Sequence, residues 1–464
     1  MPKKAKTVFV CRECGYESAK WMGQCICGAW NSFEEEKVQS VSDARSRSFA
    51  GEGRTAKVSK PSPVSEIKSG NHERLDTGIG ELNRVLGGGL VKGSLTLISG
   101  EPGIGKSTLI LQAASYIAGK YGKVLYVSGE ESEEQIKMRA DRVCPESVEN
   151  LYLLSETNME NISDAFREMK PAFLIIDSIQ TMYVPEAESA PGSISQVRSC
   201  GNELMRMGKV SGVPVFIVAH VTKSGELAGP KIIEHLVDCV LNFTGERNHE
   251  LRILRSYKNR FGTTSEIGAF EMAEEGLTEI KNLSGTFLED LEDGNEGAVA
   301  TAVYEGTRPL LLEVQALVSP ANIGFARRTA IGADNSRLAM ILAVLERKAG
   351  LAMINQDVYV NIVGGLKPEG TSYDLAVALA VYSSYRGIGS SSTTLAIGEI
   401  GLTGDLRGIQ NTEKLVREAA RMGFRKIILP AKSAAKLSEH PDGVLLCGVR
   451  NVSEAIAVFR NDGE

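Results

Sequence analysis

The sequence lacks a hydrophobic run long enough to cross a membrane. Its longest apolar stretches, such as Ala376–Tyr382, are far shorter than the ~20 residues that a bilayer-spanning helix needs. The basic start, Met-Pro-Lys-Lys-Ala-Lys, leads into no long apolar segment, which argues against a secretory signal. These absences predict a cytoplasmic protein that does not contact a membrane.

A general excess of positive charge is also missing. The chain carries 52 Lys and Arg against 58 Asp and Glu, a net charge of −6, which excludes a surface coated all over by nucleic acid. Residues 1–70 differ, because they hold 12 basic and 8 acidic residues. Any contact with nucleic acid is therefore expected to be local, on a groove or in a pore.

The 464 residues are enough for about three domains. Residues 1–32 read as a compact Cys-rich unit. Residues 33–70 are rich in Ser, Lys, Glu and Pro, as in a flexible linker. Residues 71–283 and 284–464 are expected to form two α/β domains, with a turn-rich stretch over residues 284–297 at the start of the second.

Short apolar runs separated by helical stretches mark both α/β domains, a pattern typical of parallel strands buried on both faces. The expected strands of the first are Leu95–Ser99, Val124–Ser128, Leu151–Leu154, Phe173–Ile176 and Val215–Ala219, followed by a hairpin of Val240–Phe243 and Leu251–Tyr257. The second is expected to pair strands Ala298–Glu305 and Leu310–Val318 and to contain helices Arg337–Ala349, Thr371–Tyr385 and Thr412–Met422.

A phosphate-binding loop is the clearest chemical motif. Gly100–Ser107 matches G-x-x-x-x-G-K-[ST], follows an apolar strand and opens a helix. Its glycines let backbone N–H groups converge on phosphate oxygens. Lys106 is expected to reach the β- and γ-phosphates of ATP, and the Ser107 hydroxyl to bind Mg²⁺. The expected nucleotide-binding residues here are Gly100, Glu101, Pro102, Gly103, Ile104, Gly105, Lys106, Ser107 and Thr108.

Acidic residues end the two neighbouring strands. Asp177 follows a buried strand, where an unpaired acid is costly, and it is the expected second partner of Mg²⁺. The alternative is an N-cap for the next helix. Glu130 is the preferred residue to orient and polarise the attacking water, with Glu131 as the second choice and a solvated helix start as the alternative.

His220 ends the strand that begins at Val213. A polar group there can detect the γ-phosphate and pass the signal to the following loop. The alternative is an ordinary hydrogen-bonded structural histidine.

Five segments together resemble the bacterial RadA (Sms) family of RecA-like ATPases in recombinational repair. They are Gly100–Ser107, Tyr126–Ser132, Leu174–Ser178, Ala219–Lys223 and Lys258–Gly262. The resemblance covers nearly the whole chain, and Lys-Asn-Arg-Phe-Gly is its most distinctive segment. It implies a DNA helicase that migrates recombination branches, forms a ring of typically six subunits and serves a RecA-type recombinase.

The same resemblance assigns cationic residues to two tasks. Lys258 and Arg260 would enter a neighbouring subunit's nucleotide site and stabilise charge on the γ-phosphate; the alternative is two solvated cations. Two loops, residues 182–195 and 221–231, would face the pore of the ring. Lysines contact phosphates without reading sequence. The expected contacts with single-stranded and branched DNA are Lys223, Lys231, Arg327 and Arg328.

Four of the eight cysteines lie in the first 27 residues. Cys11-x-x-Cys14 and Cys25-x-Cys27, each followed by Gly, resemble two zinc knuckles. Four thiolates suit tetrahedral Zn²⁺, and a unit of ~30 residues needs such support to fold. The family has C-x-x-C in both pairs, so the second knuckle is one residue tighter here. Disulfides or free thiols are the alternative.

Residues from about 286 onward resemble the proteolytic domain of Lon, most clearly at Gly398–Gly404. Lon uses a Ser–Lys dyad in which the lysine takes the serine proton. The alignment places Ser372 near the serine position and Glu413 where the lysine belongs, although Lys414 is adjacent. A non-proteolytic scaffold that closes the ring is therefore expected.

Two rival functions stay open. The first is an ATP-dependent Lon-like serine protease, against which Glu413 argues. The second is a switch resembling the KaiC-type ATPases, which would use nucleotide to control partners without DNA. The paired cysteines and the loop lysines favour a DNA-dependent motor.

Overall fold

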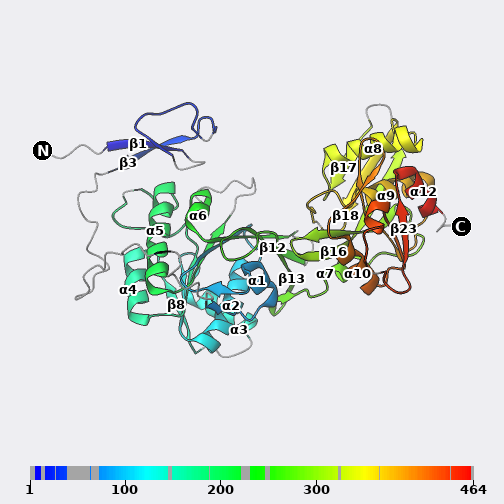
Figure 1. Ribbon diagram of the computed structural model, residues 1–464. Helices are drawn as coiled ribbons and strands as arrows, with labels where there is room; N and C mark the ends of the chain where they lie inside the picture. Colours follow the sequence, from blue (N-terminus) through cyan, green and yellow to red (C-terminus); the bar gives the residue numbers. More distant parts are fainter. Residues whose placement is uncertain are drawn as a thin grey trace. The chain divides into compact units, whose positions relative to one another are not determined.

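The chain folds into two compact units, Met1–Glu279 and Ile280–Glu464 (Figure 1). The computed structural model describes residues 6–11, 16–26, 28–38, 63, 73–144, 149–187, 189–220, 230–245, 251–321, 326–364, 366–438 and 440–460. No helix in these ranges is both long and apolar enough to cross a bilayer.

A small antiparallel sheet begins the chain. Its strands are β1 (Lys6–Cys11), β2 (Glu17–Ser18) and β3 (Phe33–Val38), in the order β2-β1-β3. Residues 33–38 were expected in the linker, but they pair along all of β1, from Lys6–Val38 to Cys11–Phe33. The N-terminal fold therefore continues to Val38.

A nine-stranded sheet is the centre of the first unit, in the order β14-β13-β12-β11-β6-β10-β9-β7-β8. Six neighbouring strands are parallel: β6 (Leu95–Gly100), β7 (Val124–Ser128), β8 (Leu151–Ser155), β9 (Phe173–Asp177), β10 (Val215–His220) and β11 (Cys239–Gly245). Three antiparallel strands extend it: β12 (Leu251–Asn259), β13 (Ile267–Ala273) and β14 (Gly276–Glu279). The strands β4 (Arg74–Leu75) and β5 (Leu90–Val91) pair separately.

Helices bury both faces of this sheet, because successive strand side chains point to opposite faces. Ile98 of β6 belongs to one apolar core and its neighbour Leu97 to the other. The first core contains residues of α1 (Gly80–Leu86), α2 (Lys106–Tyr121) and α3 (Glu133–Val143). The second contains residues of α4 (Met159–Met169), α5 (Ile194–Ser211) and α6 (Pro230–Leu236).

The second unit contains a seven-stranded sheet in the order β17-β18-β16-β15-β19-β22-β23. Its strands are β15 (Ala298–Glu305), β16 (Arg308–Pro320), β17 (Arg328–Ile331), β18 (Gln356–Ile362), β19 (Thr394–Ala396), β22 (Lys426–Pro430) and β23 (Leu445–Val449), with β20 (Glu399–Ile400) and β21 (Leu406–Arg407) as a separate pair. Its helices are α7 (Leu283–Phe287), α8 (Asn335–Ala349), α9 (Asp374–Arg386), α10 (Thr412–Arg421), α11 (Ala431–Ala434) and α12 (Val452–Arg460).

The predicted α/β class is confirmed. The stretch predicted to be turn-rich, residues 284–297, begins within α7 and continues mainly as turns and loop. Two local expectations need correction. Helix α9 begins at Asp374, so Ser372 lies in the preceding turn. Lys231 was expected in a loop but falls in α6, which opens at Pro230, because proline is favoured in a helix's first turn.

Candidate nucleotide site and its surroundings

The phosphate loop joins β6 to α2. Gly103 and Gly105 have φ values of 79° and 111°, a region that side chains with a Cβ disfavour. A Cβ added to Gly103 would meet no atom within 4 Å, so the loop curves around open space. Lys106 lies across this curve and donates from Nζ to the carbonyl oxygens of Gly100, at 2.8 Å, and Glu101, at 2.9 Å.

A cavity of about 460 Å³ opens beside this loop. It is lined by Gly103, Gly105, Lys106, Ser107, Thr108, Ser128, Glu130, Glu131, Arg139, Arg142, Asp177, His220 and Met272. Residues of the parallel strands β7, β9 and β10, of the antiparallel strand β13 and of helices α2 and α3 therefore share one space. Their meeting follows from topology, because the carboxyl ends of parallel strands lie at the same edge of a sheet.

The ammonium group of Lys106 is nearly inaccessible, with 3% of the residue exposed. Burial lowers the pKa of Lys106 to about 8, although the nearby carboxylates of Asp177 and Glu130 act to raise it. A bound polyphosphate would add further negative charge beside the Lys106 ammonium group and so favour its charged form.

Asp177 ends β9 inside the cavity and is 7% exposed. The phenolic hydroxyl of Tyr126, on β7, donates to Asp177 Oδ2 at 2.5 Å. Burial raises the pKa of Tyr126 well above its ordinary value, and the carboxylate adds to the effect. The tyrosine hydroxyl thus stays protonated and holds one carboxylate oxygen, which leaves the other available to a cation.

The two neighbouring glutamates have different partners. The Ser178 hydroxyl donates to Glu130 Oε1, and His220 Nε2 lies 3.3 Å from Glu130 Oε2. Glu131 instead pairs with the guanidinium of Arg139. A carboxylate held by a hydroxyl and an imidazole keeps its position, whereas one neutralised by arginine is a weaker base. The geometry therefore favours Glu130 over Glu131 as the group that faces water.

The motifs did not single out several residues of this site: Ser178, Arg139, Arg142 and the Tyr126 hydroxyl. Arg139 and Arg142 lie on α3, three residues apart and so on one helix face. Arg139 Nη1 is buried and has no hydrogen-bond partner among the described residues. Arg139 and Arg142 could have been predicted from the sequence, because two arginines one helical turn apart follow the acidic loop at residues 130–131.

The donor set fits ATP with Mg²⁺. A curved glycine loop, a buried lysine, a hydroxyl at Ser107 and a carboxylate at Asp177 meet at one cavity. Phosphate oxygens accept from loop N–H groups and ammonium, and Mg²⁺ takes hydroxyl and carboxylate oxygens.

Lys258 and Arg260 lie at the opposite end of the strands. In β11, Phe243 is beside Gly100 of the phosphate loop, whereas Cys239 pairs with Asn259. These two points of β11 are four residues apart along the strand, about 13 Å. These cations therefore do not line the cavity of their own chain, whose wall contains neither of them.

Hydrogen bonds hold both cations where they are. Lys258 Nζ donates to the carbonyl oxygen of Glu234, at the end of α6, at 2.6 Å. Arg260 Nη1 lies 3.1 Å from Oδ1 of Asp238. Side-chain exposure is 58% for Arg260 and 4% for Asp238, so a buried acid anchors an arginine that reaches the surface.

Half of the predicted zinc ligands can be placed. Cys11 and Cys25 are buried in one small cluster with Phe33, and Cys11 Sγ lies 3.1 Å from the Ser32 hydroxyl. Cys14 and Cys27 lie outside the described residues.

Of the predicted DNA contacts, Lys223 lies outside the described residues, as does the side chain of Lys231. Arg327 and Arg328 are both exposed, at the start of β17 in the second unit.

The Lon-like positions do not form a dyad. The Ser372 hydroxyl donates to the carbonyl oxygen of Ala302 at 3.4 Å. Glu413 accepts from the Ser438 hydroxyl at 3.0 Å and pairs with Arg417 at 3.3 Å. Within the described ranges neither lysine nor histidine hydrogen bonds to Ser372.

Comparisons with known proteins agree with this organisation. Family models for an AAA domain, for subunit ChlI of Mg-chelatase and for a rubredoxin metal binding domain match residues 61–226, 321–433 and 9–35. The DNA repair protein RadA of Bacillus subtilis (strain 168) is 50% identical over 456 residues, which cover 98% of each chain. The chain belongs to the RadA family.

A second RadA relative, from Listeria monocytogenes, is 47% identical and also covers 98% of both chains. A solved KaiC-like protein, PH0186 of Pyrococcus horikoshii, is 20% identical over 45% of this chain and 99% of its own, with a TM-score of 0.38. The predicted membership of the RadA family is confirmed, and with the AAA-domain match the chain is an ATPase of a DNA repair family.

Proposed function

We propose that this RadA family member is a DNA-dependent helicase that works as a ring, of six subunits as the resemblance implies, and unwinds or migrates branched recombination intermediates. The position of Lys258 and Arg260 supports this most directly. They lie at the strand ends opposite the phosphate loop, so they can act on phosphates only in a neighbouring subunit.

The motif residues of the cavity each have a task in this proposal. ATP with Mg²⁺ supplies the phosphoanhydride bond and an electrophilic phosphorus. Lys106 and the loop N–H groups hold the β- and γ-phosphates, while Ser107 and Asp177 hold the cation. Glu130, oriented by Ser178 and His220, accepts a proton from the attacking water.

His220 connects this chemistry to DNA. It ends β10, directly before the residue 221–231 segment that carries Lys223 and Lys231. A change in the Glu130–His220 contact on loss of the γ-phosphate would move the start of that segment. Together with Arg327 and Arg328, its lysines would contact the DNA backbone without reading sequence.

We also propose Zn²⁺ at Cys11, Cys14, Cys25 and Cys27. Burial of Cys11 and Cys25 in one cluster supports this, as does the rubredoxin-type model over residues 9–35. The unit would contact DNA or a RecA-type recombinase, and we place the protein in the cytoplasm. Metal analysis of purified protein tests the ligands, since Cys25→Ser should lose the zinc and Cys200→Ser should retain it.

Strand displacement on forked DNA with ATP tests the main proposal. We expect displacement by the wild-type chain and none by Lys106→Ala, with rings visible in electron micrographs. ATP turnover that does not respond to single-stranded DNA, without displacement, would instead favour the nucleotide switch. Single copies alone, in the presence of ATP and oligonucleotide, would exclude the ring.

A further inference from the structure

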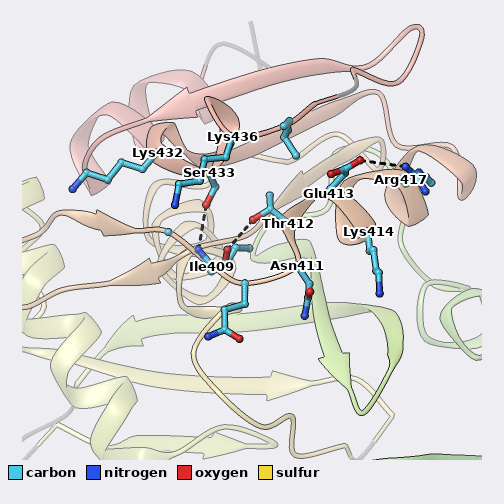
Figure 2. Close-up of a pocket in the computed structure, with 12 residues that line it drawn as sticks. Ile409, Asn411, Thr412, Glu413, Lys414, Arg417, Lys432, Ser433 and Lys436 are labelled. Atoms are coloured by element: carbon cyan, nitrogen blue, oxygen red, sulfur yellow. Dashed lines mark hydrogen bonds and ion pairs between the residues drawn. The ribbon is translucent and has the colours of Figure 1, made fainter.

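A second cavity, of about 720 Å³, lies within the unit Ile280–Glu464. Two segments form its walls, residues 408–414, which lead into α10, and residues 432–437, which begin in α11 (Figure 2). It is larger than the cavity beside the phosphate loop, and its volume is within the range of ~300–1,000 Å³ that small-molecule sites have. Neither segment lines the cavity beside the phosphate loop.

Positive charge dominates its wall. Four cations line it, Lys414, Arg417, Lys432 and Lys436, against one acid, Glu413. Glu413 is already engaged, because it pairs with Arg417 and accepts from the Ser438 hydroxyl. The three lysines are exposed and, within the described part of the chain, their side chains form no ion pair or hydrogen bond.

The wall is held in shape without a ligand. The backbone N–H of Ile409 donates to the Ser433 hydroxyl at 3.2 Å, which joins the two segments. The Thr412 hydroxyl donates to the carbonyl oxygen of Ile409 at 2.9 Å. Both hydroxyl residues are buried, with 8% of Thr412 and 4% of Ser433 exposed. Figure 2 shows both contacts, the first between the two segments and the second within residues 408–414.

Uncompensated lysines around a preformed hollow repel one another, and a bound polyanion removes that repulsion. The first residues of α10 line the same hollow, and helix N-termini add to the attraction of anions. Ile409 and Leu437 supply apolar wall on which a base or another flat group could lie.

We propose that this cavity binds a small ligand carrying a chain of phosphates, of the size of a nucleoside di- or triphosphate. The site is separate from the phosphate loop and does not depend on the helicase function proposed above. The cavity wall includes Glu413, which occupies the position where the resemblance to Lon would require the dyad lysine. The proposed anion site therefore lies at the position where Lon has its catalytic lysine.

Calorimetric titration with inorganic tripolyphosphate tests this. The full-length Lys106→Ala chain is used, because its phosphate loop has lost the ammonium group. We expect one saturable equivalent per chain. Lys432→Ala/Lys436→Ala should weaken binding about 100-fold, at roughly tenfold for each charge-assisted contact. Lys432→Arg/Lys436→Arg should stay within a few-fold of the parent.

A matched pair in the same unit, Lys281→Ala/Lys367→Ala, removes two exposed lysines that do not line the cavity and should bind as the parent does. Displacement of tripolyphosphate by ADP would identify a nucleotide ligand, and failure of ADP to compete would identify an inorganic polyphosphate. The absence of saturable binding, or equal losses in both alanine pairs, would overturn the proposal. So would Lys432→Ala/Lys436→Ala weakening a 20-nucleotide DNA but not tripolyphosphate.

Discussion

Arg260 Nη1 lies 3.1 Å from Oδ1 of Asp238, an acid buried at the base of an exposed arginine. Lys209 Nζ lies 2.7 Å from the other oxygen, which also accepts from the N–H of Leu95 at 3.1 Å. Burial acts to raise the pKa of Asp238, but these hydrogen bonds hold it below its ordinary value. The arginine therefore projects from a charged and fully hydrogen-bonded anchor.

Replacing Asp238 should impair the function of Arg260 without changing the nucleotide cavity. Asp238→Asn retains an acceptor for Leu95 and loses the charge that orients the guanidinium. We expect about a tenfold lower kcat for DNA-stimulated ATP hydrolysis and an unchanged Kd for ATP, measured separately with a fluorescent analogue. Asp141→Asn, which removes an exposed acid of α3, is the control. A parallel change in Kd would show that Asp238 acts on the fold rather than on the arginine.

Arg260 itself should serve a neighbour. Mixing Arg260→Ala subunits with wild-type subunits should depress ATP hydrolysis by more than the variant's share, because each defective subunit also disables the adjacent site. Arg252 of β12, the strand that ends just before Arg260, is buried, so the less buried Arg255 of the same strand provides the better control mixture, as Arg255→Ala. Activity that falls in simple proportion to the fraction of Arg260→Ala would contradict a role between subunits.

Substitutions of the adjacent residues Glu130 and Glu131 should differ in their effect on ATP hydrolysis. Glu130→Gln keeps the shape of the side chain and one acceptor oxygen but cannot take a proton, so turnover should fall by about 10² or more while ATP still binds. Glu131→Gln weakens the pair with Arg139 and should cost about tenfold or less. Single-turnover hydrolysis and nucleotide binding measured on both variants decide between them. The reverse order of effects would move the water-activating role to Glu131.

ATP affinity should fall as pH rises. Burial lowers the pKa of Lys106 to about 8, so the charged form that binds phosphate is complete below pH 7 and is lost as pH rises through 8. Above that value affinity should fall by up to tenfold per pH unit, and binding should take up a proton. Calorimetry between pH 7 and 9.5 in two buffers measures both. Lys106→Arg, always charged, should remove the dependence in this range.

No protein cleavage is expected from the second unit. The Ser372 hydroxyl bonds only a backbone carbonyl among the described residues, and Glu413 is engaged by Ser438 and Arg417. Casein incubated with the protein and ATP should remain intact. Cleavage that disappears in Ser372→Ala would establish the protease instead.

The order of strands and helices around the phosphate loop could be predicted from sequence, because buried parallel strands are continuous apolar runs. The expected run Val124–Ser128 has the same bounds as β7, and Phe173–Ile176 differs from β9 only at Asp177. Asp177 and Glu130 were found for the same reason, since a charged residue at the end of such a run stands out against its apolar neighbours.

The partners of those residues were not predictable. The contacts of Glu130 with Ser178 and His220 and of Asp177 with Tyr126 join separate segments. Each of these depends on which strands are neighbours in the sheet. The cavity at Lys432 and Lys436 could not be predicted from the sequence, because scattered surface lysines form no sequence pattern.

The sequence by itself determined the chemistry of this protein. A glycine loop with Lys106 and Ser107 indicates a phosphate site, because a strand precedes it and a helix follows. Tertiary structure alone decided the geometry. It gave Glu130 and Glu131 different partners and put Lys258 and Arg260 at the end of the sheet away from that loop. The reason is physical, because residue type and local pattern are written along the chain, whereas distances between strands arise only when the sheet assembles.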